Sequence, residues 1–183
     1  MKHVIIAGSP RAGKTTMSKS LMSGNLGFTH YKMDSIKRAV FDIFCPENKD
    51  WHFASKVVAR MIKKICDDNR QESTKPECFI FDTPHLYPED LIDFPKDEFV
   101  IIFLGYTEIS VEEKTNEILS HDRADCWTKK LERKKLEALV EGNIAFSKEL
   151  KEQCEKYGIK YFEMSEDMEE HLLEAIDYVV QNI

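Results

Sequence analysis

Short runs of apolar residues alternate along the chain with longer segments in which apolar residues recur every three or four positions. The short runs are typical of β-strands and the periodic segments of amphipathic helices. Strands are predicted over residues 2–7, 28–32, 78–82, 99–104 and 159–163. Because helical patterns separate these five runs, we predict an α/β fold: a mostly parallel sheet covered on both faces, with ligands at the carboxyl ends of its strands.

Two helical patterns lie between the second and third predicted strands. The first begins at Asp34 and stops at Cys45 and Pro46, and the second runs over residues 54–65. This interval is longer than a minimal crossover between parallel strands requires. We therefore expect a helical insertion, about residues 33–75, that overhangs a substrate pocket.

The chain after the fourth predicted strand contains further helix signals. Ser110 and Glu113 form the pattern of a capping box, in which each residue hydrogen-bonds to the other and opens a helix. A long amphipathic pattern over residues 136–154 has Gly158 as its stop, and a closing helix is predicted over 168–179.

Positive charge gathers in the segment of about residues 107–135, which holds Arg123, Lys129, Lys130, Arg133, Lys134 and Lys135. In a chain with an acidic balance such a cluster has two interpretations. It is either a lid that supplies cations to a transferring phosphate, or a solvated helix face. The sequence leaves both open.

The first predicted strand leads into the pattern Gly-x-x-x-x-Gly-Lys-Thr, which is typical of a phosphate-binding loop. Glycines permit the turn and a close approach of backbone N–H groups to phosphate oxygens, the lysine reaches the β- and γ-phosphates, and the threonine hydroxyl binds magnesium. We therefore predict a nucleoside triphosphate site formed by Gly8, Ser9, Arg11, Ala12, Gly13, Lys14, Thr15 and Thr16.

The third predicted strand ends in Asp82, directly after an apolar run. A carboxylate at this place is similar to a Walker B aspartate, which holds Mg²⁺ beside the hydroxyl of the phosphate-binding loop. Thr15 and Asp82 are therefore the candidate metal residues. The alternative is a strand-end aspartate that only caps the next turn.

The composition of the chain argues against several classes of protein and partner. The 183 residues, 42% of them hydrophobic and 32% charged, suit a single domain, which we expect to cover residues 1–183. A net charge of −7 argues against nucleic acid as a partner, because the surface repels polyanions. The five cysteines form no C-x-x-C pair, which argues against a disulfide framework or a zinc site. The same cysteine pattern fits a reducing cytoplasm, where we expect the protein to be. No apolar run is long enough for a membrane span, so we expect no membrane partner.

With these residues in view, the chain resembles the P-loop small-molecule kinases, a broad group that includes nucleoside monophosphate, shikimate and gluconate kinases. The resemblance covers the order of the elements along nearly the whole chain, and it is most specific in residues 8–16. It implies a three-layer αβα sandwich with sheet order 2-3-1-4-5. It also implies that the insertion binds the phosphoryl acceptor, that a lid closes on ATP, and that ATP and Mg²⁺ are the cofactors.

The resemblance also assigns roles to three charged residues. The segment around Asp34 is similar to one in chloramphenicol phosphotransferases and shikimate kinases, where an aspartate meets the acceptor hydroxyl. By this similarity Asp34 binds the acceptor or acts as general base, Arg38 clamps the acceptor, and Arg123 is a catalytic lid arginine. Two simpler interpretations stay open: Asp34 is the N-cap of its helix, or it forms an ordinary surface pair with Arg38.

The function predicted from the sequence is an ATP-dependent phosphotransferase that moves the γ-phosphoryl to a hydroxyl or phosphate of a small molecule, as a monomer or homodimer. The segment around Arg123 departs from nucleotide kinases, which carry several arginines there, and this lowers the expectation of a nucleotide acceptor. The alternative is a nucleotide-binding or nucleotide-hydrolysing switch without an acceptor. Against it, no Asp-x-x-Gly element follows Asp82.

Overall fold

The computed structural model describes residues 1–183 except 25, 45–49, 73–76, 85, 121–127 and 129–130. Its centre is a sheet of five parallel strands in the order β2-β3-β1-β4-β5. The strands are β1 (His3–Gly8), β2 (Phe28–Lys32), β3 (Cys78–Asp82), β4 (Phe99–Gly105) and β5 (Lys160–Glu163). The predicted α/β class, the five parallel strands and the sheet order are confirmed.

The helices also follow the predicted periodicity. They are α1 (Lys14–Ser23), α2 (Asp34–Phe44), α3 (Trp51–Glu72), α4 (Val111–Ser120), α5 (Arg133–Tyr157) and α6 (Met168–Asn182). The sequence did not predict the short 3₁₀ helix η1 (Pro88–Leu91), because a single turn is too short to show helical periodicity.

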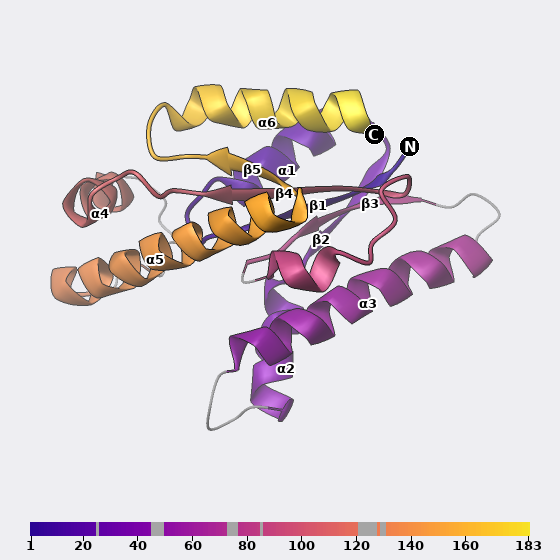
Figure 1. Cartoon of the computed structure of the whole chain (residues 1–183), viewed down its shortest axis with the longest axis horizontal. Helices are drawn as coiled ribbons and strands as arrows, with labels where there is room; N and C mark the ends of the chain where they lie inside the picture. Colours follow the sequence, from indigo (N-terminus) through magenta and orange to yellow (C-terminus); the bar gives the residue numbers. More distant parts are fainter. Residues whose placement is uncertain (25, 45–49, 73–76, 85, 121–127, 129–130) are drawn as a thin grey trace.

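Successive side chains of β1 lie on opposite faces of the sheet, and the core therefore has two layers. Val4 and Ile6 pack with residues of α1 and α6 on one face of the sheet. Ile5 and Ala7 pack on the other face with residues of α3 and of the C-terminal part of α5. Figure 1 shows the same arrangement, with α1 and α6 above the sheet and α3 and α5 below it. Because β1 is covered on both faces, the loop that follows it leaves from the middle of the sandwich.

Two helix boundaries were predicted from particular residues, and both are confirmed. The backbone N–H of Glu113 donates to the Ser110 hydroxyl at 3.1 Å, and the Glu113 carboxylate accepts from the Ser110 N–H at 3.1 Å, which is the reciprocal capping box. Gly158 ends α5 with φ of 65°, in the left-handed region that favours glycine.

Helices α2 and α3 form the insertion between β2 and β3, below the sheet in Figure 1. Val40, Phe41 and Ala54 form a small apolar cluster of their own, with Trp51 packed against it. The ring of Trp51 meets the ring of Phe41 edge-on, with the centroids 4.6 Å apart. Trp51 packs against this small cluster and also against the large cluster below the sheet, so it connects the two.

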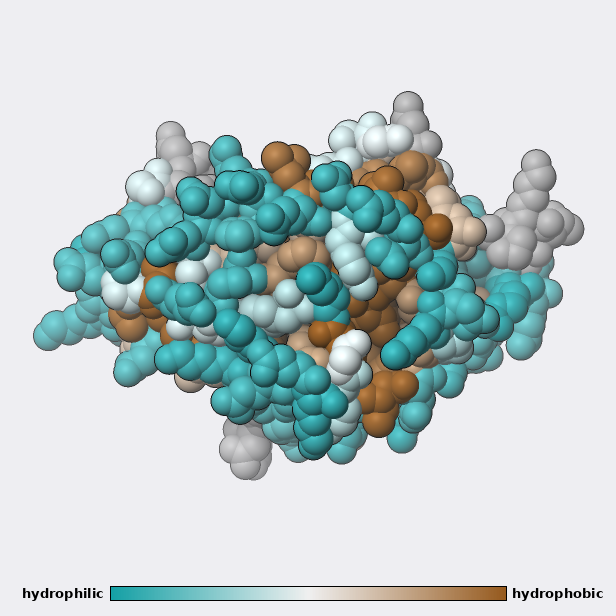
Figure 2. Space-filling model, turned by 45° about the horizontal axis from the view of Figure 1, so that its top comes forward, coloured by the Kyte–Doolittle hydropathy of each residue, from teal (hydrophilic) through white to brown (hydrophobic). Residues whose placement is uncertain are grey.

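Hydrophilic side chains cover most of the face seen in Figure 2, with hydrophobic patches between them. Leu173 and Val180 of α6 are among the exposed large hydrophobic residues of the chain. Among the residues that the structure describes, no helix combines the length and the apolar character that a bilayer crossing requires.

Candidate functional site

The predicted phosphate-binding loop joins the central strand β1 to α1. Gly8 has φ of 128°, and a Cβ atom there would lie 1.9 Å from the carbonyl oxygen of Leu104 in β4. Glycine is therefore required by the close approach of the two backbones. Gly13, with φ of 88°, precedes the first residue of α1 and turns the chain into the helix. Helix α1 therefore begins directly after β1 at the carboxyl edge of the sheet, and the N-terminus of a helix is a favourable place to bind an anion.

Lys14 lies inside this loop. Its Nζ donates to the carbonyl oxygens of Gly8 at 3.0 Å and Ser9 at 2.7 Å, and the residue is only 7% exposed. Burial lowers the pKa of Lys14 to about 8, while the Asp82 and Asp34 carboxylates act in the opposite direction. The ammonium is thus held near the point where phosphate oxygens would converge, with two acidic groups in electrostatic range.

Asp82 reaches the same place from the neighbouring strand. In the sheet it is in register with Ile6 of β1 and with Lys32 of β2, so its side chain emerges beside the loop. The hydroxyl of Thr15 donates to Asp82 Oδ2 at 2.8 Å. A hydroxyl and a carboxylate side by side are hard oxygen donors of the kind that Mg²⁺ prefers, so these two residues fit a magnesium site.

His30 of β2 adds an imidazole to this place. Its Nε2 lies 3.9 Å from Asp82 Oδ2 and has no hydrogen-bond partner among the described residues. Burial lowers the pKa of His30, against the opposing effect of the Asp82 carboxylate. His30 was not among the site residues predicted from the sequence, although its position two residues before the end of the second predicted strand placed it near the carboxyl edge.

Asp34 lies at the end of β2, next to Asp82 across the sheet edge. The backbone N–H of Met33 donates to the carbonyl oxygen of Asp82 at 2.9 Å. Asp34 is the first residue of α2, so Met33 and not Asp34 has the N-cap position. The Asp34 carboxylate pairs with Lys37, whose Nζ lies 3.3 Å from Oδ1, and not with the exposed Arg38. The surface pair considered between Asp34 and Arg38 is therefore wrong.

The structure brings only part of the predicted residue set together. Lys14, Thr15, Asp82 and Asp34 converge at the carboxyl edge of the sheet. Thr16 is exposed on α1, and the guanidinium of Arg11 donates to the Thr128 hydroxyl. Arg123 and most of the segment that precedes α5 lie outside the described residues.

Ser9 belongs to the predicted phosphate-binding loop, but its side chain contacts α5. Its side chain is fully buried, and its hydroxyl lies 2.6 Å from the hydroxyl of Ser147 in α5. Ser147 also accepts from the backbone N–H of Tyr106 at 3.2 Å and donates to the Asn143 carbonyl at 2.9 Å. The Ser9 hydroxyl therefore connects the loop to α5, and only the backbone of Ser9 is available to bind phosphate.

Tyr106 supports the loop from a second side. Its phenolic hydroxyl donates to the carbonyl oxygen of Pro10 at 2.8 Å, inside the phosphate-binding loop. The ammonium of Lys114, a fully buried side chain of α4, lies 4.4 Å from the centroid of the same ring. Lys114 in turn pairs with Glu117, whose carboxylate oxygens lie 2.8 and 2.9 Å from Nζ.

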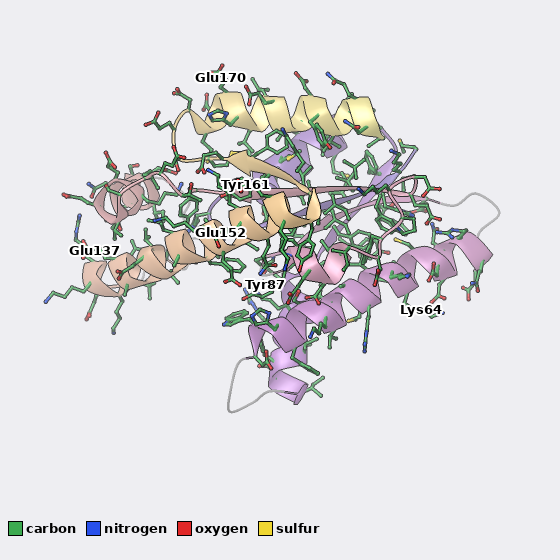
Figure 3. The ribbon with its side chains drawn as sticks, in the orientation of Figure 1. Lys64, Tyr87, Glu137, Glu152, Tyr161 and Glu170 are labelled. Carbon is green, nitrogen blue, oxygen red and sulfur yellow. The ribbon has the colours of Figure 1, made fainter. Side chains whose placement is uncertain are left out.

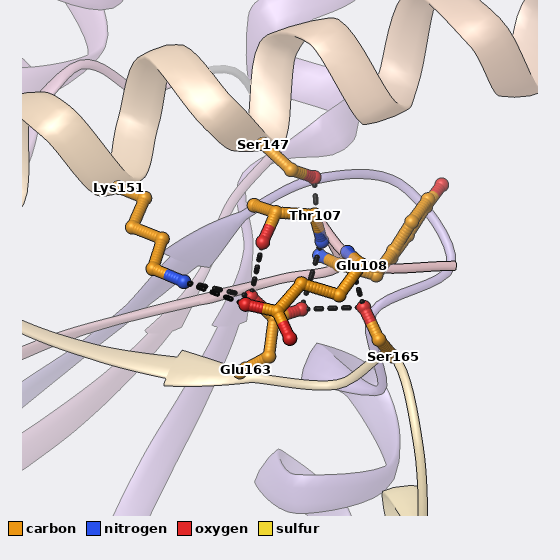
Figure 4. Close-up of polar contacts among 7 residues, drawn as sticks. Thr107, Glu108, Ser147, Lys151, Glu163 and Ser165 are labelled. Carbon is orange, nitrogen blue, oxygen red and sulfur yellow. Dashed lines mark hydrogen bonds and ion pairs between the residues drawn. The ribbon is translucent and has the colours of Figure 1, made fainter. Parts of the chain in front are cut away.

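A carboxylate at the end of β5 joins the same support (Figure 4). Glu163 accepts from the backbone N–H of Thr107 at 2.8 Å, from the Thr107 hydroxyl at 2.5 Å and from the Ser165 hydroxyl at 2.6 Å. The Nζ of Lys151 in α5 lies 3.4 Å from Glu163 Oε2. Burial alone would raise the pKa of Glu163, but the hydrogen bonds from Ser165 and Thr107 outweigh it and hold the pKa below its usual value.

Aromatic rings line the contact between α3, the residue before η1 and α5. Tyr87 stacks on His52 of α3 with ring centroids 4.0 Å apart and meets Phe146 of α5 edge-on at 5.5 Å. Figure 3 shows Tyr87 between these two helices, whereas Glu137 and Glu152 of α5 point outward. The insertion is thus attached to the sandwich through rings next to the sheet edge.

A cavity of about 380 Å³ lies at the other end of the sheet and contains none of the candidate residues. It is bounded by the start of β4 and the ends of α5 and α6, among them Phe99, Tyr157 and Tyr178. The converging side chains, and not this cavity, define the candidate site, because they carry the charges and donors that phosphate chemistry requires.

Of the five cysteines in the sequence, Cys66, Cys78 and Cys154 are free thiols in the described part of the chain. Burial raises the pKa of Cys66 and of Cys154 to about 12. Both are therefore inert packing residues at neutral pH.

Comparison with known proteins places the fold. No protein-family model matches the chain. No curated protein matches its sequence. Among solved structures, the shikimate kinase of Acinetobacter baumannii in complex with shikimate is similar over 100% of this chain and 94% of that one, with 14% identity and a TM-score of 0.59.

Two further solved structures give the same result. A sugar kinase from Janibacter sp. HTCC2649 has 13% identity and a TM-score of 0.58, over 98% of this chain and 95% of that one. The shikimate kinase of Bacteroides thetaiotaomicron has 14% identity and a TM-score of 0.56, over 98% of both chains. The chain therefore has the fold of P-loop small-molecule kinases, and the predicted resemblance is confirmed at the level of the fold.

Proposed function

We propose that the protein is an ATP-dependent phosphotransferase that moves the γ-phosphoryl of ATP to a small-molecule acceptor. The observation that carries the proposal is the convergence of Lys14, Thr15, Asp82 and Asp34 at one edge of the sheet, beside the loop. A phosphate-binding cation, a hard-oxygen pair and a carboxylate for an acceptor hydroxyl are the components that phosphoryl transfer requires. The kinase fold of the similar structures supports the same reaction class.

Each residue has a separate role in this proposal. Lys14 leaves its two carbonyl partners and binds the transferring phosphoryl group, and Thr15 and Asp82 hold Mg²⁺, which neutralises charge on the phosphates when bound. Asp34 accepts a hydrogen bond from the acceptor hydroxyl and takes its proton. Arg38 and Arg123 enter from the resemblance, as cations for the acceptor and for ATP. The α2–α3 insertion contributes the acceptor pocket, and residues 107–135 contribute the lid.

The decisive variant is Lys14→Ala. We expect phosphoryl transfer to fall on the order of 10²-fold or more, because a fixed charge near the transferring group is lost in a site that excludes water. Melting temperature and circular dichroism should stay close to those of the wild type, since burial of this ammonium is unfavourable in itself. Lys19→Ala, an exposed lysine on the same helix, is the matched control and should be silent.

The assay must separate transfer from hydrolysis. ADP formation is measured with and without a metabolite panel, and phosphorylated products are identified by mass spectrometry. A kinase yields a phosphorylated metabolite, whereas a switch protein yields only free phosphate. If Lys14→Ala transfers the phosphoryl group at the wild-type rate, the loop has no part in the mechanism and the proposal is refuted.

A further inference from the structure

We propose that the cavity of about 380 Å³ at the amino edge of the sheet binds a small organic carboxylate with an aromatic or apolar body. None of the residues placed in the phosphotransferase site lines this cavity, so the inference goes beyond the proposed function and does not depend on it. Pockets for small molecules usually measure about 300–1,000 Å³, a range that includes this cavity. The class of ligand follows from the charges and the rings that line it.

Three lysines bring positive charge to the cavity from three strand starts. Lys2 directly precedes β1, Lys96 lies shortly before β4, and Lys160 is the first residue of β5. These three strands are parallel neighbours in the sheet, so they begin at the same edge. Lysines that are far apart in sequence therefore line one cavity.

These lysines have no counter-charge at the cavity. Among the described residues that line it there is no Asp or Glu, and none of the three lysines has an ion-pair partner in the described part of the chain. The chain as a whole carries 33 acidic and 26 basic residues, so a wall with only positive charges is contrary to its overall balance. A concave site lined by charge of one sign attracts the opposite sign, which here is an anion.

Aromatic rings form much of the remaining wall. Phe94 and Phe99 are buried and meet edge-on, with ring centroids 4.9 Å apart. Tyr157 at the end of α5 and Tyr178 of α6 are partly exposed and line the same cavity. The Nζ of Lys160 lies 5.7 Å from the centroid of the Tyr178 ring. A ligand with a ring and an anionic group can therefore contact an aromatic wall and an ammonium at the same time.

Helix ends offer a simpler explanation of the lysines. Both α5 and α6 end at the cavity, and cations are favourable beside the C-terminus of a helix. At the end of α5, however, the carbonyl groups of Cys154 and Glu155 already accept hydrogen bonds from backbone N–H groups. None of the three lysines belongs to either helix, and a stabilised helix end requires no cavity lined by rings. The cavity and the charges together therefore favour a ligand.

The exposure of the lining residues indicates how the ligand is oriented. Lys96 and Lys160 are exposed, whereas Leu91 and Phe99 are almost completely buried. The anionic group therefore lies at the mouth, beside the ammonium groups and water, and the apolar body lies against the inner walls. A carboxylate suits this place better than a phosphate, because a second negative charge holds more water and disfavours a cavity with apolar walls.

The test compares naphthaleneacetate with naphthaleneacetamide, two probes with the same rings of which only the first is charged. Isothermal titration calorimetry should show a single site per chain for the acid, with a Kd of about 10 μM to 1 mM, and at least about 5-fold weaker binding of the amide. Lys96→Gln and Lys160→Gln should each weaken binding of the acid about 2- to 10-fold, because an ionic contact at the edge of water is lost. Binding of the amide should stay unchanged in both variants.

Ile92 provides a matched pair of variants with opposite charge. Its side chain lines the cavity and is 54% exposed, so a polar replacement should not disturb the fold. Ile92→Asp should weaken binding of the acid about 10-fold or more, whereas Ile92→Lys should bind it at least as well as the wild type. The amide should not distinguish the two variants. Both lose the same apolar side chain, so the difference between them reports the charge at the cavity.

Two controls exclude binding of the acid elsewhere. Lys148→Gln, at an exposed position of α5 outside the cavity, should bind the acid as the wild type does. Lys14→Ala, which lacks the cation of the phosphate-binding loop, should also bind it as the wild type does. Loss of binding in Lys14→Ala would place the acid at the loop and overturn the assignment.

Three further results would overturn it. They are equal binding of the acid and the amide, equal affinity of the wild type, Lys96→Gln and Lys160→Gln for the acid, and no detectable binding at about 10 mM acid. Equal affinity of the lysine variants would assign these lysines to the helix ends. Phosphoryl transfer does not enter any of these measurements, so a failure of the proposed function leaves their result intact.

Discussion

The two sides of the phosphate-binding loop satisfy their polar groups differently. On the β4–β5 side, formed by Ser9, Tyr106, Ser147 and Glu163, buried hydroxyls and a carboxylate are paired with one another and with backbone groups. On the β2–β3 side, formed by Asp34, Lys37 and Asp82, charged side chains converge: Asp34 pairs with Lys37, Asp82 accepts from Thr15, and the Asp34 carboxylate is more than half exposed.

This difference indicates that the two sides of the loop have separate roles. Paired polar groups in a buried network fix geometry, because each loses free energy when its partner moves. An exposed carboxylate such as Asp34 can exchange its present partner for a ligand. We therefore assign the β4–β5 side to holding the loop and the β2–β3 side to chemistry, so variants of the two sides should affect different measurements.

The largest effect is expected from Asp34→Asn on the β2–β3 side. The change keeps the shape of the side chain but removes its charge and its proton-accepting capacity, so kcat should fall about 10²- to 10⁴-fold for a hydroxyl acceptor. The free energy of unfolding should change by less than about 1 kcal/mol, since the lost pair with Lys37 involves a half-exposed carboxylate. Steady-state kinetics and urea denaturation measure the two quantities.

Asp42→Asn is the control for this prediction, because Asp42 is an exposed carboxylate of the same helix. Unchanged kinetics in Asp34→Asn would return Asp34 to the role of a charged residue in the first turn of α2, where it favours the helix dipole. A lower stability at an unchanged kcat would contradict the assignment of chemistry to this side.

An intermediate effect is expected from Glu163→Gln on the β4–β5 side. The variant removes the charged acceptor of the Thr107 and Ser165 hydrogen bonds, which should lower the free energy of unfolding by about 1–3 kcal/mol. In the folded variant, kcat should stay near the wild-type value, because Glu163 is not among the residues proposed to bind phosphate, metal or acceptor. Glu166→Gln, at an exposed position three residues later, should leave both quantities unchanged.

The smallest effect is a pH dependence of that stability difference. The pKa of Glu163 is lowered by folding, so the unfolded chain binds more protons as pH falls. The stabilisation by Glu163 should be complete above the unfolded pKa of about 4.3 and decrease as pH falls through the lower native pKa. Urea denaturation of wild type and Glu163→Gln between about pH 3 and pH 6 should show the two curves converging at the acid end. A difference independent of pH would contradict an ionised Glu163 as the cause.

The sequence by itself determined the elements of the fold and the centre of the candidate site, because both follow from local patterns. Short apolar runs predicted the five strands, helical periodicity predicted the main helices, and the sheet order came with the resemblance. Gly8, Gly13, Lys14 and Thr15 lie within one strand–turn–helix unit, so their spacing is enough to predict a phosphate-binding loop. Asp82 was found for a similar reason, as the end of an apolar run.

Only the tertiary structure decided which side chains surround that loop. Ser9 and Ser147 are 138 residues apart in sequence, and their contact depends on how α5 packs on the sheet. The partner of Asp34 also could not be predicted from spacing, because residues three and four positions apart on a helix can both pair. The contact of Lys37 with Trp51 selected Lys37 as that partner. Local spacing specifies a motif, whereas burial and partners depend on elements that meet only after folding.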